Sequence, residues 1–289
     1  MESGGAGSGP PHLIGRFSRL RSELGKDDAR PALIGFASTL AFFGVVIWAV
    51  AASGNWPRVQ RSFFSAEAFR NAWPDVLGGF WLDLQMWVVA EILILALALL
   101  LAVLRTLRGP AFLPLRVVSI VFIDIFRGVP LLLVIFLLGF GVPALQIPGL
   151  PNSALVWGVV ALVLSYAAYT AEVYRAGIDS VNESQRSAAR SLGLTQWQAL
   201  RYAVLPQAVR NVVPALLNGL VSLQKDVALI SVLGVREAVR EADIIRARTF
   251  NFTSLVVAAV LFLLASVPLA RLADWYSARD RARRSQSAT

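Results

Sequence analysis

Long uncharged stretches constrain this chain more than any other feature of its sequence. Six segments hold about 20 or more mostly apolar residues, the length that one α-helix needs to cross a hydrocarbon core of about 30 Å. They lie near residues 33–52, 80–104, 115–141, 153–175, 207–234 and 252–273. Hydrophobic residues make up 56% of the 289 residues and charged residues only 16%, which excludes a water-soluble globular domain. We therefore predict an all-α membrane protein with about six transmembrane helices.

Basic residues predict the orientation of these helices. With the N-terminus inside, 18 of the 27 Lys and Arg residues fall on the inner side and 7 on the outer side, while Arg127 and Lys225 lie within spans. Basic residues near span ends are retained in the cytoplasm, so both termini are predicted to be cytoplasmic. Topology and the anionic lipid of the inner leaflet account for the net charge of +9, so we expect no nucleic acid partner.

Several kinds of chemistry are excluded by composition. The chain has no cysteine and a single histidine, His12, so it offers neither a thiolate metal site nor a histidine-based catalytic site. Neither Lys26 nor Lys225 stands in a glycine-rich phosphate-binding loop. We expect no catalytic residue, no metal and no cofactor on this chain, and any ATP that its work requires must be bound by another chain.

A short polar helix pair is predicted between the fourth and fifth spans. Asn182 or Ser184 is suited to cap the first helix, and Gly193 is suited to end it in the left-handed conformation. Thr195 and Gln198 have the spacing of a capping box that starts the second helix. The sequence therefore predicts a stiff, bent pair of helices.

The faces of this helix pair are predicted from spacing. Ala188, Ala189 and Leu192 are expected on one apolar face of the first helix, and Leu205-Pro206 is expected to end the second helix and begin the next. Three arginines are expected to point outward: Arg186, Arg190 and Arg201. Two helices around a glycine also occur in DNA-binding units, but fewer than about 40 residues between two spans leave no core for such a domain.

Polar groups within the spans form a second set of candidates. An ionised side chain at mid-bilayer costs about 2.5–3.5 kcal/mol, so such residues face a cavity or a partner. The predicted substrate path comprises Glu91, Arg127, Gly128, Pro130, Tyr166 and Glu172. Arg127 sits where Gly128 and Pro130 should break a helix and suits a carboxylate, whereas Glu91 suits an ammonium group. Two alternatives stay open: Glu91 and Arg127 pair with each other, and Lys225 and Asp226 act in gating or interhelical pairing.

Three sequence blocks carry a resemblance to a known family. They are residues 124–132, residues 168–178, and residues 205–208 followed by Lys225-Asp226 and residues 231–235. The loop at 176–206 resembles the EAA loop of permease subunits of bacterial ATP-binding cassette importers. The flanking blocks are similar to the polar amino acid uptake branch, and the resemblance covers roughly residues 78–275.

The resemblance implies an organisation and a set of partners. It implies a five-helix permease domain at 78–275; outside this domain the sequence itself predicts an extra span and outer segment at 33–77, a leader at 1–32 and a basic tail at 276–289. The partners it implies are a cassette ATPase dimer that holds ATP and Mg, a second permease subunit, an extracytoplasmic amino-acid-binding protein and the lipid bilayer of the bacterial inner membrane.

The loop is implied to act as a coupling helix that docks into the ATPase. The coupling residues carried over from the family are Ser187, Ala188, Ala189, Gly193, Leu194, Leu205 and Pro206. Ser187 stands where the family has a glutamate, which removes one charged contact. The alternative function is an ion-gradient-driven transporter or channel with Glu91 as the coupling acid, but such a protein has no need for a capped, docking helix pair.

Overall fold

A computed structural model describes residues 29–52, 54–107, 109–181 and 183–286 of this chain. Within these ranges all regular structure is helical, and five helices are long and apolar enough to cross a membrane. A sixth span results if a bent pair of helices is taken as one, which confirms the predicted fold class. The chain divides into two compact units, residues 1–61 and 62–289.

The first unit contains α2 (Ala29–Ala52), which is the predicted extra span. All of its described side chains, from Ile34 onward, are exposed, because no other part of the described chain covers them. The hydroxyls of Ser38 and Thr39 donate to the carbonyl of Gly35 at 3.0 and 2.7 Å, so neither remains unsatisfied. A helix that is apolar on every side is suited to lipid. Most of the predicted leader lies outside the described residues.

The second unit is built on α4 (Ala66–Thr106), which follows the short helix α3 (Trp56–Phe63). Ser65 caps α4, since its hydroxyl accepts a hydrogen bond from the Ala68 amide at 3.3 Å. The 41 residues of α4 extend about 60 Å, which exceeds the thickness of a bilayer core. α4 also runs without interruption through residue 77, where the boundary of the permease domain was predicted.

The core of the second unit lies between α4 and α7 (Ala154–Asp179). Small buried residues line this contact, which lets the two backbones approach closely: Ala90, Ala98, Ala161, Ala167, Ala168 and Ala171. α7 also packs against α10 (Leu205–Asp226). There, a Cβ atom on Gly177 would overlap the side chain of Val212, so only glycine permits the contact.

The predicted span at 115–141 is two helices in the structure. α5 (Leu113–Gly128) and α6 (Leu131–Ala144) meet at an angle of 104°. Pro130 lacks the N–H that a continuous helix requires, and it restricts Val129, which is extended with φ −94° and ψ 131°. The predicted break at Gly128 and Pro130 is confirmed.

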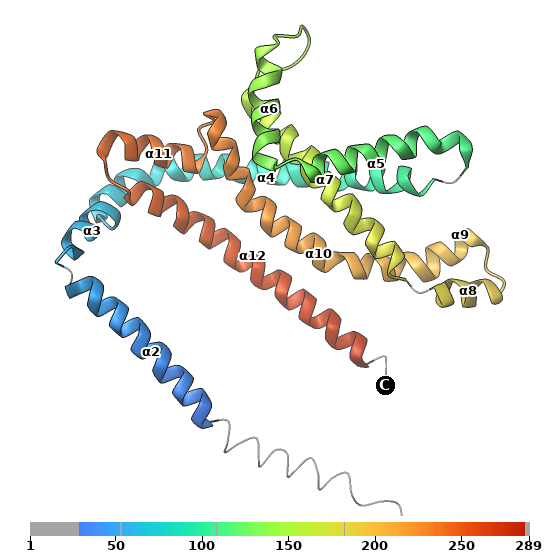
Figure 1. The fold of residues 1–289 in the computed structure, drawn as a ribbon, viewed down its shortest axis with the longest axis horizontal. Helices are drawn as coiled ribbons and strands as arrows, with labels where there is room; N and C mark the ends of the chain where they lie inside the picture. Colours follow the sequence, from blue (N-terminus) through green and yellow to red (C-terminus); the bar gives the residue numbers. More distant parts are fainter. Residues whose placement is uncertain (1–28, 53, 108, 182, 287–289) are drawn as a thin grey trace, which may run out of the picture. The chain divides into compact units, whose positions relative to one another are not determined.

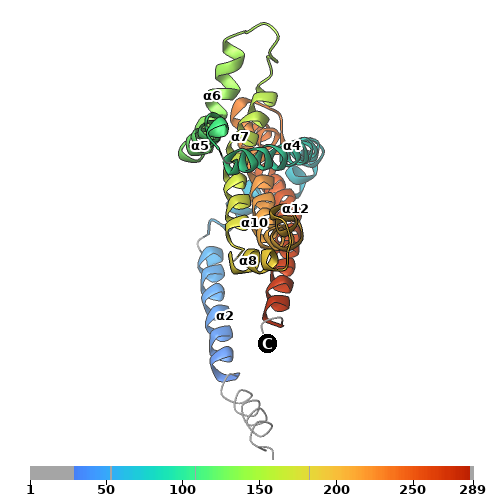
Figure 2. The ribbon, with the colours of Figure 1, turned by 90° about the vertical axis from the view of Figure 1, so that its right-hand side faces the viewer.

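The remaining elements complete the bundle (Figure 1). After α7 come α8 (Glu183–Ser191), α9 (Gln196–Ala199), the π-helical turn η2 (Leu200–Val204) and α10. A 3-10 helix, η3 (Val227–Leu233), then leads to α11 (Ala238–Thr249) and α12 (Thr253–Gln286). Figure 1 places α8 and α9 at the ends of α7 and α10, away from α11, and Figure 2 shows α8 at the same end in the turned view.

Candidate functional site

The turn between α8 and α9 is set by Gly193. This residue has φ +85°, and its amide donates to the Arg190 carbonyl at 2.9 Å. The Leu194 amide donates to the Ala189 carbonyl at 3.3 Å. These two bonds form a Schellman motif, which satisfies carbonyls at the end of α8 and requires a left-handed residue at Gly193. The predicted helix end is therefore confirmed.

The start of α9 is fixed by a reciprocal pair of bonds. The Thr195 amide donates to Gln198 Oε1 at 2.9 Å, and the Gln198 amide donates to Thr195 Oγ1 at 3.3 Å. This is the predicted capping box. Ser184 lies inside α8 rather than before it, and the other predicted cap, Asn182, lies outside the described residues.

The exposed face of α8 differs from the predicted one. Ala188 is exposed and the Leu192 side chain is 84% exposed, but only 7% of Ala189 is accessible. Ala189 is therefore turned into this chain, and placing it on the free apolar face was wrong. Residue 189 is rotated by about 100° from residue 188 and by about 60° from residue 192, so it lies at the edge of their face, where α8 packs against the rest of the chain.

Other predicted coupling residues are accessible to different degrees. Ser187, Leu205 and Pro206 are exposed, and Leu194 is half-buried. Arg190 and Arg201 point outward as predicted, and the side chain of Arg186 lies outside the described part. The sequence interpretation missed Tyr202, an aromatic residue that is 68% exposed in η2. An aromatic residue within a polar loop is the signal that would have found it.

Leu205-Pro206 does not end a helix, which corrects the prediction. α9, η2 and α10 follow one another directly, and Pro206 lies in the first turn of α10. The Leu205 amide bonds to the Leu200 carbonyl, five residues back, as in a π-helix. Because proline lacks an N–H, a wider turn at this point lets the helix continue past it.

The loop is firmly attached to the two helices that carry it. Val181, Val204 and Ala208 form a buried cluster at its base. Asn211 of α10 donates to the Ser180 hydroxyl at the end of α7 at 2.6 Å. The loop is therefore anchored to both α7 and α10.

Charged side chains brace α7 against α4 near this loop. Glu172 forms ion pairs with Arg105 of α4 and with Arg175, the latter at 2.8 Å. Arg175 also reaches Asp179 at 2.7 Å. Glu172 was predicted in the substrate path; in the structure two arginines engage its carboxylate, and the residue joins α7 to α4. Its partner Arg105 is 67 positions away, so sequence reasoning did not pair them.

A hydrogen bond links α7 to the end of α10. The Tyr166 hydroxyl donates to Asp226 Oδ2 at 2.6 Å, at the point where α10 ends and η3 begins.

Lys225 is exposed, and its ammonium forms no ion pair among the described residues. Glu91 on α4 is half-buried and, within the same ranges, makes neither a hydrogen bond nor an ion pair.

Arg127 lies at the bend between α5 and α6 and contacts an aromatic residue. Its guanidinium is 5.8 Å from the ring centroid of Tyr169, and the Tyr169 hydroxyl donates to the Arg127 carbonyl at 3.2 Å. No ion pair joins Arg127 to Glu91 in the described structure, so the alternative in which these two residues neutralise each other is not observed.

Two buried carboxylates meet at the start of α11, and sequence reasoning missed them. Glu237 accepts hydrogen bonds from the Val239 and Arg240 amides at 2.9 and 2.6 Å, and Asp83 of α4 accepts one from the Ala238 amide at 3.2 Å. Asp83 is 1% exposed and Glu237 is fully buried. Burial raises the pKa of Glu237, against the effect of the two amide donors. The pair fixes α11 to α4.

Comparisons with known proteins match this architecture. A family model described as binding-protein-dependent transport system inner membrane component matches residues 94–281. A putative glutamine transport system permease protein of Rickettsia conorii is 35% identical over 191 residues, 65% of this chain and 85% of the relative. The arginine transport system permease protein ArtQ of Bacillus subtilis is 33% identical over 190 residues, 65% of this chain and 84% of the relative.

Solved structures give the same result. A crystal structure of an amino acid ABC transporter with histidines is 31% identical and has a TM-score of 0.65, covering 71% of this chain and 94% of its own. The family match begins inside α4 and ends inside α12, so it leaves out α2 and α3.

Proposed function

Since this chain belongs to the family of binding-protein-dependent transport system inner membrane components, and is a permease subunit of an amino acid ABC importer, we propose that its α8–α9 loop couples it to a separate ATPase. The permease is the non-catalytic subunit of such a transporter. The ATPase, a cassette dimer, would bind ATP and Mg, because this sequence contains no phosphate-binding loop.

The observation that carries the proposal is an exposed apolar side chain on a rigid helix end. Leu192 is 84% exposed and directly precedes Gly193, whose Schellman motif fixes its position. Burying such a side chain on docking contributes about 2 kcal/mol. Ala188, one turn away on the same side, is small enough for an ATPase surface to approach closely.

Transmission of movement follows from how the loop is held. The Asn211–Ser180 hydrogen bond and the contact of Gly177 with Val212 connect α10 to α7 just above α8. A closing ATPase dimer would therefore move both helices together. Glu172 and its arginines would carry this movement on to α4.

We assign the amino acid path to the polar groups of the bundle. Glu91, which lacks a partner among the described residues, suits the ammonium group of an amino acid, and Arg127 at the α5–α6 bend suits its carboxylate. Tyr166 and Asp226 would lie along the same path. A second permease subunit would complete it, and an extracytoplasmic amino-acid-binding protein would deliver the substrate, with both termini of this chain in the cytoplasm of a bacterium. A gradient-driven transporter with Glu91 as the coupling acid is not favoured by the relatives.

The coupling proposal is tested by replacing Leu192. We expect Leu192→Asp to weaken binding of the ATPase by roughly 30-fold, which corresponds to the loss of about 2 kcal/mol. The measurement is the ATPase activity that co-purifies with the tagged permease, together with amino acid import in vesicles. Leu192→Met, which keeps an apolar side chain of similar volume, is the matched control and should retain both. Normal co-purification and import by Leu192→Asp would refute the coupling role.

A further inference from the structure

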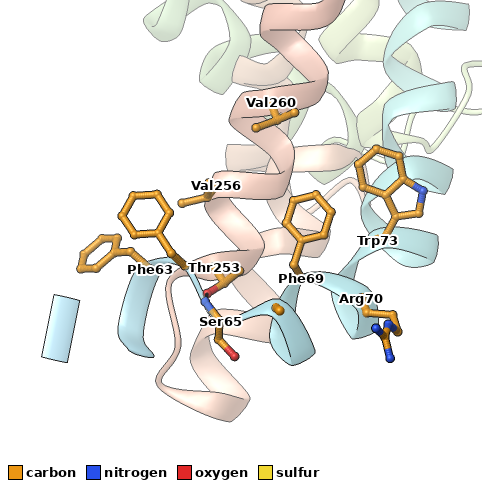
Figure 3. A pocket seen from close by; sticks show the side chains of 10 residues that line it. Phe63, Ser65, Phe69, Arg70, Trp73, Thr253, Val256 and Val260 are labelled. Carbon is orange, nitrogen blue, oxygen red and sulfur yellow. Dashed lines mark hydrogen bonds between the residues drawn. The ribbon is translucent and has the colours of Figure 1, made fainter. Parts of the chain in front are cut away.

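A hollow of about 680 Å³ lies between the start of α4 and the start of α12, beside the end of α3 (Figure 3). Aromatic and aliphatic side chains supply most of its lining: Phe63, Phe64, Phe69, Trp73, Val256 and Val260. All of these residues belong to the second compact unit. The hollow is not part of the coupling loop or of the proposed substrate path.

The polar groups of this hollow gather at one end. In Figure 3, Ser65, Thr253 and Arg70 lie toward one end and Val260 lies at the other. Ser65 and Thr253 are engaged with the protein, since the Ser65 amide donates to Thr253 Oγ1 at 3.2 Å. Arg70 is exposed, and its guanidinium has no hydrogen-bond or ion-pair partner in the described residues. Glu67, one turn earlier on α4, forms no ion pair with it.

A further hollow lies between the same two helices. A second hollow of about 800 Å³ begins at Pro74 of α4 and at Leu261 of α12, where the first one ends. It is lined without any ionisable side chain: Pro74, Leu77, Gly78, Phe80, Trp81, Leu84, Leu261, Leu264 and Ala265. The two hollows, together called the groove, border about 27 Å of α4 from Ala66 to Leu84.

We propose that this groove is a binding site for an anionic phospholipid. Both of its walls belong to helices long and apolar enough to cross a membrane, so we place the groove against acyl chains rather than an aqueous solute. The unpaired guanidinium of Arg70 binds the lipid phosphate, for which arginine provides several donors in a fixed geometry. One acyl chain lies along the apolar groove, and Trp73 and Trp81 contact it where aromatic rings commonly mark the interface.

A lipid bound in the groove stabilises the contact of α4 and α12 with α11. Phe80 and Leu261 face the groove and also belong to the buried cluster in which α4 and α12 pack against Ala238 and Ala242 of α11. A bound chain fills space beside this cluster, so lipid stabilises the part of the fold that holds α11. This effect requires no ATPase and is independent of the proposed coupling.

The test measures lipid retention and thermal unfolding of the full chain in detergent. After incubation with phosphatidylglycerol in vesicles or micelles, we expect the protein to retain bound lipid, detected by native mass spectrometry, and to unfold at a higher temperature. Phosphatidylcholine and inorganic phosphate should have neither effect. Arg70→Gln should lower phosphatidylglycerol retention by about tenfold, which is typical for the loss of a charge-assisted hydrogen bond. Arg70→Lys should keep part of it.

Two further variants separate the parts of the site. Arg248→Gln removes an exposed charge from α11 that lines neither hollow, and should retain lipid like the wild type. Val260→Trp fills the hollow and should lower retention without changing a charge. Equal retention by Arg70→Gln and the wild type overturns the proposal. A thermal shift with inorganic phosphate equal to that with lipid, or equal retention of phosphatidylcholine, also overturns it.

Discussion

The left-handed turn at Gly193 offers a direct test of how the loop works. A Cβ atom at this position would meet no atom within 4 Å, so a substitution is penalised by backbone conformation alone. At φ +85°, Gly193→Val costs about 1–3 kcal/mol in strain. That strain lowers the ratio of formed to unformed turn by about 5- to 150-fold. Asparagine tolerates the left-handed region, so Gly193→Asn should cost much less.

The assay is amino acid import in vesicles that contain the permease, its ATPase and its binding protein, at equal amounts of inserted permease. We expect Gly193→Val to reduce import in proportion to the lost turn and Gly193→Asn to retain most of it. Hydrogen exchange of residues 183–204 should rise in the valine variant only. If the valine variant imports normally, or if both variants lose import equally, the left-handed turn is not what the loop requires.

Two further perturbations follow from the buried charges. Glu172→Gln leaves two arginines without their shared carboxylate and should lower the free energy of unfolding by about 1–2 kcal/mol, since the cluster is only partly buried. Asp179→Asn, at the exposed end of the cluster, should lower it by under about 0.5 kcal/mol. Thermal melts in detergent compare the two variants, and equal effects would contradict the bracing role. Burial raises the pKa of Glu237 above its ordinary 4.5, so its contribution to stability is complete below pH 4.5 and is lost as pH rises through the pKa of the folded protein. The free energy of unfolding of the wild type, relative to that of Glu237→Gln, should therefore fall with rising pH. A constant difference across the titration would refute this.

Local signals let the sequence determine much of this protein. Apolar length predicted the spans, and Gly193, Thr195 and Gln198 predicted a helix end and a helix start that the structure contains. Pro130 predicted the break between α5 and α6. Each of these features depends on hydrogen bonds or steric limits within a few residues, so a pattern along the chain is sufficient to reveal it.

Contacts between distant segments were decided by the tertiary structure. Ala189 and Leu192 looked alike in sequence, but packing of α8 buries the first and leaves the second exposed. The ion pair of Glu172 with Arg105 and the hydrogen bond from the Ala238 amide to Asp83 join residues 67 or more positions apart. Helical spacing tells which residues share a face of one helix, but not which face meets a neighbour. That choice depends on how α4, α7 and α11 pack, and no local pattern encodes it.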